Sequence, residues 1–476
     1  MKKLIRKLFT KQDPEFYRLK DNHLIPSLTT KDLLGLGIGM VVGTAIFTLP
    51  GIVAANHTGP AVPLSFLLGA IGAGMASFAY AEMASVLPFA GSAFSWLSVL
   101  FGEFFGWLTG WALLAEYFIS VAFVASGWSA YMRGFLASFN LKIPTVVSSG
   151  FNPSQGSYVD LLAIIIIFIA GRLLTKGTKS VSRVENTIVF FKVLVVIIFI
   201  IVGFTAIHVK NYTPFIPAHK SKTSFGGWQG IIAGTAQVFL AYVGFDAIAA
   251  NTAETKNPEK TMPRGIIGTL LIGTLLFVLV SLVLVGMFKY NLYDNNAEPA
   301  AWALRKSGHY FTASLLSVVA IIGMFASLIG IHLASSRLIY SFGRDGLLPS
   351  ILGKTSQTHL PLNALNLVTV AAIIVAGFLP FTFLSSLVSA GTLIAFIMVS
   401  LGLYALRKRE GHDLPEARFK APFYPFLPAI SAVFSGIIFM GLNIDAKILI
   451  SGWLIIGALI YLVYGIRHSK LQQKNN

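Results

Sequence analysis

Apolar residues run through this chain in long continuous blocks that are separated by short polar connections. Most blocks hold about 20 predominantly apolar residues, the number that an α-helix needs to cross the ~30 Å hydrocarbon core of a membrane. The pattern predicts an all-α membrane protein with twelve transmembrane helices. We expect them at residues 33–55, 61–87, 104–131, 158–174, 184–207, 229–251, 264–288, 312–341, 364–380, 382–406, 423–441 and 447–467.

Composition and charge agree with this interpretation. Of the 476 residues, 55% are hydrophobic and only 12% are charged, and the mean hydropathy is +0.74. The net charge of +17 raises the alternative of a nucleic-acid-binding protein. Most of the 36 Lys and Arg residues, however, fall in every second connection if the N-terminus lies inside, which is the positive-inside pattern. The charge therefore indicates membrane topology, with both termini cytoplasmic, and no nucleic-acid partner is expected.

The segments outside the predicted helices are short. Residues 1–32 form a basic N-terminal segment without the apolar core or cleavage site of a secretory signal peptide. Its first nine residues fit either an amphipathic helix on the membrane surface or a solvated tail. The connections are too short for a folded catalytic domain, and "NNAEPAAW" (residues 295–302) fits an ordinary polar turn.

Motifs of an enzyme or an ATP-driven motor are missing from the sequence. It contains no Cys, no Gly-x-x-x-x-Gly-Lys-Ser/Thr phosphate loop and no His-Glu-x-x-His or other clustered metal ligands. We therefore expect no cofactor, no metal and no enzymatic activity. Function must then depend on polar groups inside the helical bundle.

Glycine is concentrated in the first predicted helix, "GLGIGMVVGTAIFTLPG" (residues 35–51). Because glycine inside a helix costs about 0.5–1 kcal/mol relative to alanine, this concentration needs a reason. One is close packing through small residues at four-residue spacing. The other is an interrupted helix, since "GTAQVFLAYVGFDAIAANTAE" (residues 234–254) offers a second break in the sixth helix. Breaks at matching places mark binding sites in inverted-repeat transporters, and this match favours interruption.

Two charged residues stand out by their depth in the predicted helices: Glu116 lies near the middle of the third, and Lys192 lies about two turns into the fifth. A Lys or Asp at a helix centre costs roughly 2.5–3.5 kcal/mol, and such residues usually mark ion or substrate paths. A structural ion pair is the alternative to a titrating group. Asp246, beside the second break, fits both proton coupling and capping of freed backbone N–H groups. His332 fits a hydrogen bond between helices better than a proton relay.

Four features together resemble the amino acid–polyamine–organocation (APC) superfamily, specifically the bacterial relatives of the cationic amino acid transporter (CAT) family. They are "GIGMVVGTAIFTLPG", "AYVGFDAIAANTAETKNPEKTMPRGI", "RLIYSFGRDGLLP" and the intramembrane Glu116 and Lys192. The resemblance covers essentially the whole chain. It implies a five-plus-five inverted repeat with broken helices one and six, and proton-coupled secondary transport of amino acids in the bacterial cell membrane. The repeats would span 33–207 and 229–406, followed by two helices over 423–467 and a cytoplasmic tail, 468–476.

The resemblance also implies a substrate site built from the two breaks. Backbone N–H groups of residues 43–45 would bind the substrate carboxylate, and freed carbonyl groups would bind its ammonium. Lys192 would replace the cation of sodium-coupled relatives, and Glu116 would communicate between Lys192 and the pocket. One departure is Ala45, where the family usually has glycine. The implied substrate residues are Val41, Gly43, Thr44, Ala45, Leu240, Val243, Phe245 and Met324.

The expected substrate follows from the side chains around that site. Val41, Phe245 and Met324 are apolar, and a lysine or arginine substrate would need an acid for its buried charge. We therefore expect proton symport of neutral amino acids, with alanine and the branched-chain amino acids foremost. A cationic amino acid transporter, an exchanger and a non-transporting amino acid sensor are the alternatives.

Overall fold

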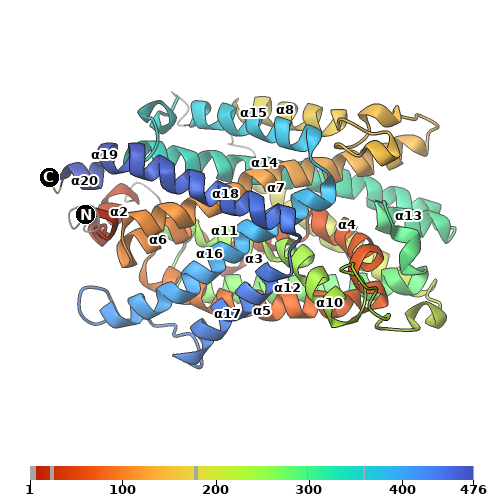
Figure 1. Ribbon diagram of the computed structural model, residues 1–476, viewed down its shortest axis with the longest axis horizontal. Helices are drawn as coiled ribbons and strands as arrows, with labels where there is room; N and C mark the ends of the chain where they lie inside the picture. Colours follow the sequence, from red (N-terminus) through yellow and green to blue (C-terminus); the bar gives the residue numbers. More distant parts are fainter. Residues whose placement is uncertain are drawn as a thin grey trace.

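The computed structural model describes residues 7–21, 26–89, 91–175, 181–296, 298–356 and 360–474. Over these residues the regular secondary structure is helical, and β pairing is limited to isolated bridges such as Leu28 with Thr255. The long helices run along the longest axis of the molecule, and both termini lie at one end (Figure 1). We call this the termini end and the opposite one the far end. The all-α prediction is confirmed.

Seven helical stretches within the described residues are long and apolar enough to cross a membrane. Three shorter apolar helices, α8, α15 and α17, fall on the predicted segments 158–174, 364–380 and 423–441. The number of membrane crossings stays a prediction. The long stretches are Thr44–Val86, Glu103–Ala137, Thr187–Phe204, Pro258–Met287, Tyr310–Asp345, Phe381–Arg409 and Ile444–Gln473, and the short helices are Leu161–Thr175, Leu362–Phe378 and Phe426–Met440.

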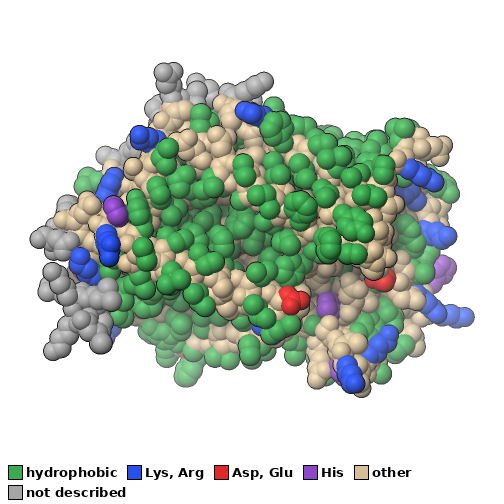
Figure 2. All heavy atoms as spheres, turned by 45° about the horizontal axis from the view of Figure 1, so that its top comes forward, with side chains coloured by type: hydrophobic (Ala, Val, Ile, Leu, Met, Phe, Trp, Pro, Cys, Tyr) green, Lys and Arg blue, Asp and Glu red, His purple; other side chains and the backbone are tan. Residues whose placement is uncertain are grey.

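The surface has the character of a bundle embedded in lipid. Hydrophobic side chains cover the middle of the face in Figure 2, and Lys and Arg side chains gather towards its ends. Large apolar side chains are exposed on the outer helices α9 (Val181–Phe204) and α18 (Ile444–Ile460), including Phe190 at 64% and Ile448 at 62%. Contiguous apolar surface on this scale fits contact with lipid chains rather than water.

Helix α7 (Glu103–Ala137) lies in the centre of the bundle. It packs closely against α14 (Tyr310–Asp345) and α16 (Phe381–Arg409) and is buried along most of its length. Small residues permit this close packing: a Cβ on Gly391 of α16 would lie 3.1 Å from the backbone N of Glu116. α7 is therefore the scaffold from which inward-facing side chains are presented.

The first predicted helix is interrupted near its middle. α3 (Thr30–Val41) and α4 (Thr44–Val53) are separated by Val42 and Gly43. Gly43 is the N-cap of α4, with φ −113° and ψ −143°, and a Cβ on it would lie 3.0 Å from the carbonyl oxygen of Met40. The C-terminus of α3 and the N-terminus of α4 therefore lie next to each other at this break.

The sixth predicted helix is interrupted as well. α10 (Gly227–Val238) is followed by a 3-10 turn (Phe239–Tyr242) and the short helix α11 (Phe245–Ala249). Gly244 between them has φ 132°, where residues with a side chain are strained. A Cβ there would also lie 2.9 Å from the Cβ of Met40. The two breaks therefore lie directly against each other.

Two of the connections between predicted membrane helices contain a helix that was not expected there. α6 (Ser92–Leu100) precedes α7, and α13 (Pro299–Lys306) connects α12 (Pro258–Met287) to α14 at the far end (Figure 1). The interpretation of residues 295–302 as an ordinary polar turn was wrong for their second half. Pro299 occupies the first turn of α13, where its missing N–H is no loss.

The described part of the N-terminal segment packs on the bundle. α2 (Pro14–Asp21) follows Gln12, whose N–H donates to the carbonyl of Ser98 at 3.0 Å. Gln12 is 6% exposed and Tyr17 is 3% exposed, so this part is anchored by buried side chains. The amphipathic helix expected for the first nine residues falls largely outside the described residues.

Candidate binding cavity

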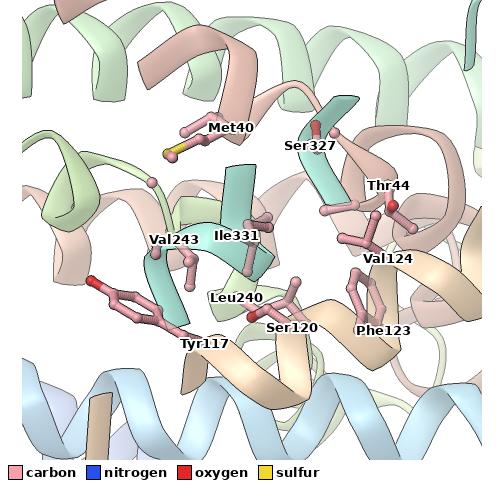
Figure 3. Close-up of a pocket in the computed structure, with 16 residues that line it drawn as sticks. Met40, Thr44, Tyr117, Ser120, Phe123, Val124, Leu240, Val243, Ser327 and Ile331 are labelled. Atoms are coloured by element: carbon pink, nitrogen blue, oxygen red, sulfur yellow. The ribbon is translucent and has the colours of Figure 1, made fainter. Parts of the chain in front are cut away.

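A cavity lies where the two breaks meet α7 and α14 (Figure 3). Its volume of about 50 Å³ has room for a few water molecules. Residues of both breaks, of α7 and of α14 line it, and Ser327 of α14 lies near Thr44 of the first break (Figure 3). The lining is mostly apolar and, among the described residues, includes no Asp or Glu. The site therefore combines exposed helix ends with an uncharged side-chain surface.

The structure brings six of the eight predicted substrate residues to this cavity. Of the other two, Phe245 packs its ring against Tyr80 and Phe396, with ring centroids 5.6 and 5.1 Å apart. Met324 is buried in α14 and does not line the cavity either. The six that line it are Val41, Gly43, Thr44, Ala45, Leu240 and Val243.

Sequence reasoning missed the lining residues of α7 and α14. They recur every three or four positions, so in each helix they share one face. The sequence feature that could have identified them is their helical spacing, counted from Glu116 in α7 and between the lining residues themselves in α14. It is weak because a helix that is buried on most sides shows no contrast between apolar and polar faces. The missed residues include Tyr117, Ser120, Phe123 and Val124 in α7, and Ile331 and Ala334 in α14.

The N-terminus of α4 opens into the cavity. Gly43, Thr44 and Ala45 line it, and the first N–H groups of a helix have no partner within the helix. Thr44 is 2% exposed, and its Oγ1 has no hydrogen-bond partner among the described residues. The hydroxyl of Thr48 donates to the carbonyl of Thr44 at 2.8 Å. Free amides at the positive end of a helix beside an unpaired hydroxyl are a suitable site for an anion.

Carbonyl groups of both breaks face the same region. Val41 is the last residue of α3, so its carbonyl has no further helical turn to bond. The carbonyl of Leu240 already accepts from the N–H of Val243 at 3.0 Å, which leaves one lone pair for another donor. These oxygens can bind a cationic group close to the anion site, as a zwitterion requires.

Lys192 of α9 lies behind the end of α3. Its Nζ donates to the carbonyl of Gly39 at 2.9 Å and to the hydroxyl of Ser327 at 2.7 Å. Its side chain is 2% exposed and lies against Gly323, where a Cβ would overlap the lysine stem. A cation beside a helix C-terminus interacts favourably with the helix dipole. Lys192 therefore holds α3, α9 and α14 together, and one of its partners, Ser327, lines the cavity.

A second polar cluster lies at the α7 side of the cavity. The hydroxyl of Tyr117 donates to Oδ2 of Asp246 at 3.1 Å, and the N–H of Gly244 donates to Oδ1 at 2.9 Å. Glu116 lies beside Asp246 and Thr392, but within the described chain neither of its carboxyl oxygens has a hydrogen bond of good geometry. Asp246 thus caps the second break, and Tyr117 connects it to the cavity. His332 bonds Thr369 of α15 at 2.9 Å, between helices.

An apolar helical bundle with a cavity at two adjacent helix breaks is the architecture of a membrane permease. Comparison of the sequence with protein families agrees: the family described as amino acid permease matches residues 28–465. The chain belongs to this family, and the predicted membership of the APC superfamily is confirmed. Its relatives are permeases and transporters rather than enzymes.

Individual relatives cover nearly the whole chain. It is 52% identical to the branched-chain amino acid permease BcaP of Lactococcus lactis subsp. cremoris (strain MG1363), over 97% of this chain and 99% of that protein. It is 37% identical to the methylthioribose transporter of Bacillus subtilis (strain 168), over 95% and 96%. It is also 34% identical to the cationic amino acid transporter 3, mitochondrial, of Arabidopsis thaliana, over 81% of this chain and 63% of that protein.

Proposed function

We propose that this protein imports neutral L-amino acids, mainly the branched-chain amino acids and alanine, by proton symport with alternating access. The observation that carries the proposal is the apolar cavity at the N-terminus of α4. The name of the Lactococcus relative, a branched-chain amino acid permease at 52% identity, supports the substrate class.

In this proposal the protein spans the bacterial cell membrane with twelve helices in a five-plus-five inverted repeat. The interrupted helices α3–α4 and α10–α11 are the first and sixth, as the repeat requires. The termini end faces the cytoplasm, and the excess of Lys and Arg in the connections on that side supports the orientation.

The substrate carboxylate binds at the N-terminus of α4, on the N–H groups of residues 43–45 and the hydroxyl of Thr44. That hydroxyl is buried and lacks a partner in the described part of the chain, and a buried unpaired polar group costs about 1–3 kcal/mol until it finds one. The α-ammonium binds the carbonyl oxygens of Val41, Leu240 and Val243. The substrate therefore satisfies both kinds of backbone group that the breaks leave open.

The substrate side chain packs against Phe123, Val124, Ile331 and Ala334, which line the cavity. An arginine or lysine side chain would find no carboxylate among the described lining residues, and an unpaired buried charge is costly. Burial of methyl groups contributes about 0.8 kcal/mol per CH₂, so discrimination among valine, leucine and isoleucine is shallow. These features favour the neutral over the cationic alternative.

Proton coupling is assigned to Glu116 and Asp246, with Lys192 as a fixed cation that replaces an exchangeable one. The two carboxyl groups lie next to each other, and Tyr117 connects Asp246 to the cavity. Substrate that enters the cavity therefore contacts the cluster that carries the proton. Glu116 acts through Asp246 and Tyr117 in this arrangement, rather than directly through Lys192.

The decisive experiment is uptake of labelled leucine into sealed proteoliposomes with an inward proton gradient. Accumulation above the external concentration, abolished by a protonophore, is expected for a symporter and not for an exchanger or a sensor. Excess unlabelled leucine, isoleucine and alanine should compete, whereas arginine and glutamate should not. Strong competition by arginine without competition by alanine would overturn the proposed substrate class.

A further inference from the structure

Thr44 contacts α7 at a residue that has no side chain. A Cβ added to Gly127 would lie only 2.2 Å from the methyl group of Thr44 (Cγ2), which is too close for both to be present. The next neighbours of such a Cβ are the Cβ of Thr44 at 3.4 Å and Cε2 of Phe381 at 3.5 Å, both at ordinary contact distances. Gly127 lies within α7 and is buried. The contact with one methyl group, rather than the backbone conformation, is therefore what requires glycine at this position.

This contact determines where the Thr44 hydroxyl points. Hydroxyl and methyl share the Cβ of threonine, and χ1 has only a few staggered positions. With the methyl group held in the space above Gly127, Oγ1 occupies another staggered position. In the structure that position is buried and without a partner among the described residues, and Thr44 lies beside Val124 at the cavity (Figure 3).

We propose that Gly127 is a positioning residue for substrate binding: the space above its Cα holds the Thr44 methyl and thereby aims the Thr44 hydroxyl at the substrate carboxylate. The inference rests on the proposed function. Gly127 itself does not touch the substrate. It affects substrate binding only by its contact with the methyl group of Thr44. Removing that methyl group should therefore rescue a variant in which Gly127 carries a side chain.

The test compares KM and kcat for leucine uptake in proteoliposomes for wild type, Gly127→Ala, Thr44→Ser and the double variant. Gly127→Ala should raise KM about tenfold or more, because the added methyl displaces Thr44 and its hydrogen bond to a charged group is lost. Thr44→Ser should raise KM only a few-fold, since the hydroxyl remains but is no longer held. In the double variant serine has no methyl to clash, so KM should return to the Thr44→Ser value.

Two controls separate positioning from general damage. Gly110→Ala adds a methyl to another buried glycine of α7, where a Cβ would lie 2.8 Å from the ring of Phe342; it should leave KM unchanged. Thr44→Val keeps the branched shape but removes the hydroxyl. Combined with Gly127→Ala, it should show no rescue.

The outcomes decide the inference. A Gly127→Ala variant with wild-type KM, or a double variant as impaired as Gly127→Ala, would overturn it. If Gly127→Ala does not fold, the double variant is compared with Thr44→Ser alone: equal KM supports the inference, and a loss refutes it. Absence of leucine uptake by the wild-type protein would instead refute the proposed function, so the two failures are distinguishable.

Discussion

The cavity lies between two polar clusters that hold their ionisable groups in opposite ways. On one side, Lys192 donates to Gly39 and Ser327 at 2.9 and 2.7 Å. On the other side, the carboxyl group of Glu116 lies next to Asp246 but lacks a hydrogen bond of good geometry within the described residues. A well-bonded buried charge stabilises one arrangement of helices, whereas a poorly bonded carboxyl is better suited to gain and lose a proton. The contrast assigns a structural role to Lys192 and proton exchange to Glu116.

Removal of the bonded charge should have the largest effect. Lys192→Ala takes away the charged donor that bonds both Gly39 of α3 and Ser327 of α14 and leaves the Gly39 carbonyl only the longer bond from the Ser327 hydroxyl, at 3.3 Å. We therefore expect loss of proton-driven accumulation in proteoliposomes. Equilibrium binding of leucine should survive in part, because the helix ends at the breaks remain. Lys447→Ala, at a partly exposed lysine that bonds the carbonyl of Met440, is the control. Undiminished uphill uptake by Lys192→Ala would remove Lys192 from the mechanism.

Glu116→Gln tests the acidic side of the contrast. The amide has nearly the shape of the acid but cannot release a proton, so accumulation should fall at least tenfold and the dependence of uptake on pH should flatten. Glu103→Gln is a matched control on α7, since Glu103 accepts from Tyr461 at 2.9 Å, far from the cavity. An unchanged pH profile in Glu116→Gln would argue against proton exchange at this residue.

Tyr117→Phe tests the connection between the acids and the cavity. It deletes one hydrogen bond, to Asp246, and a typical net value of about 1 kcal/mol corresponds to a roughly fivefold rise in KM for leucine. The pH dependence of uptake should weaken with it. If KM and the pH profile both match wild type, the acids communicate with the substrate by another route.

The smallest effect is expected at Glu298, a mostly buried carboxyl group away from the cavity, in the connection before α13. Burial raises the pKa of Glu298 to about 7, although Arg305 and Arg133 act in the opposite direction. Arg305 also bonds this carboxyl. The folded protein therefore binds the proton of Glu298 more tightly than the unfolded chain does. Protonated Glu298 contributes to the stability of the fold at acidic pH, and this contribution is lost as pH rises through about 7.

The measurement is the melting temperature of the detergent-solubilised protein between pH 5 and pH 8.5. Glu298→Gln should remove a component of about 1–3 kcal/mol from the pH dependence of stability, and Asp294→Asn, at an exposed site, should not. Equal pH profiles for wild type and Glu298→Gln would show that Glu298, bonded to arginine, keeps its charge as Lys192 does and does not exchange a proton in this range.

The sequence predicted the helical class because a continuous apolar block has few alternatives to a buried or membrane helix. It also located both breaks, since glycine at Gly43 and Gly244 interrupts runs that are otherwise favourable for helix. It missed α6 and α13. Both are short helices of mostly apolar or small residues, and such a segment looks like the end of a longer helix. In both cases tertiary packing, rather than local preference, decides the structure.

The site was predicted less completely than the fold, and the reason is geometric. The glycines indicated where the breaks lie, and the resemblance to the APC superfamily implied that Val41, Gly43, Thr44 and Ala45 form the site; all four line the cavity. Which face of a buried helix points inward does not follow from its own sequence, and Phe245 and Met324 were therefore expected at a cavity that they do not line. The contact between Gly127 and Thr44 joins two helices far apart in sequence and has no sequence signal.

The ammonium group at the end of α3 has a consequence for the ionic conditions under which the protein can work. A free metal ion dissociates when the medium is dilute, but Lys192 is tethered to α9 and its effective concentration beside Gly39 never falls. The position is occupied whatever the salt composition outside the cell. In the proposed function, uptake is therefore independent of external sodium, and the proton gradient alone determines how far the substrate accumulates.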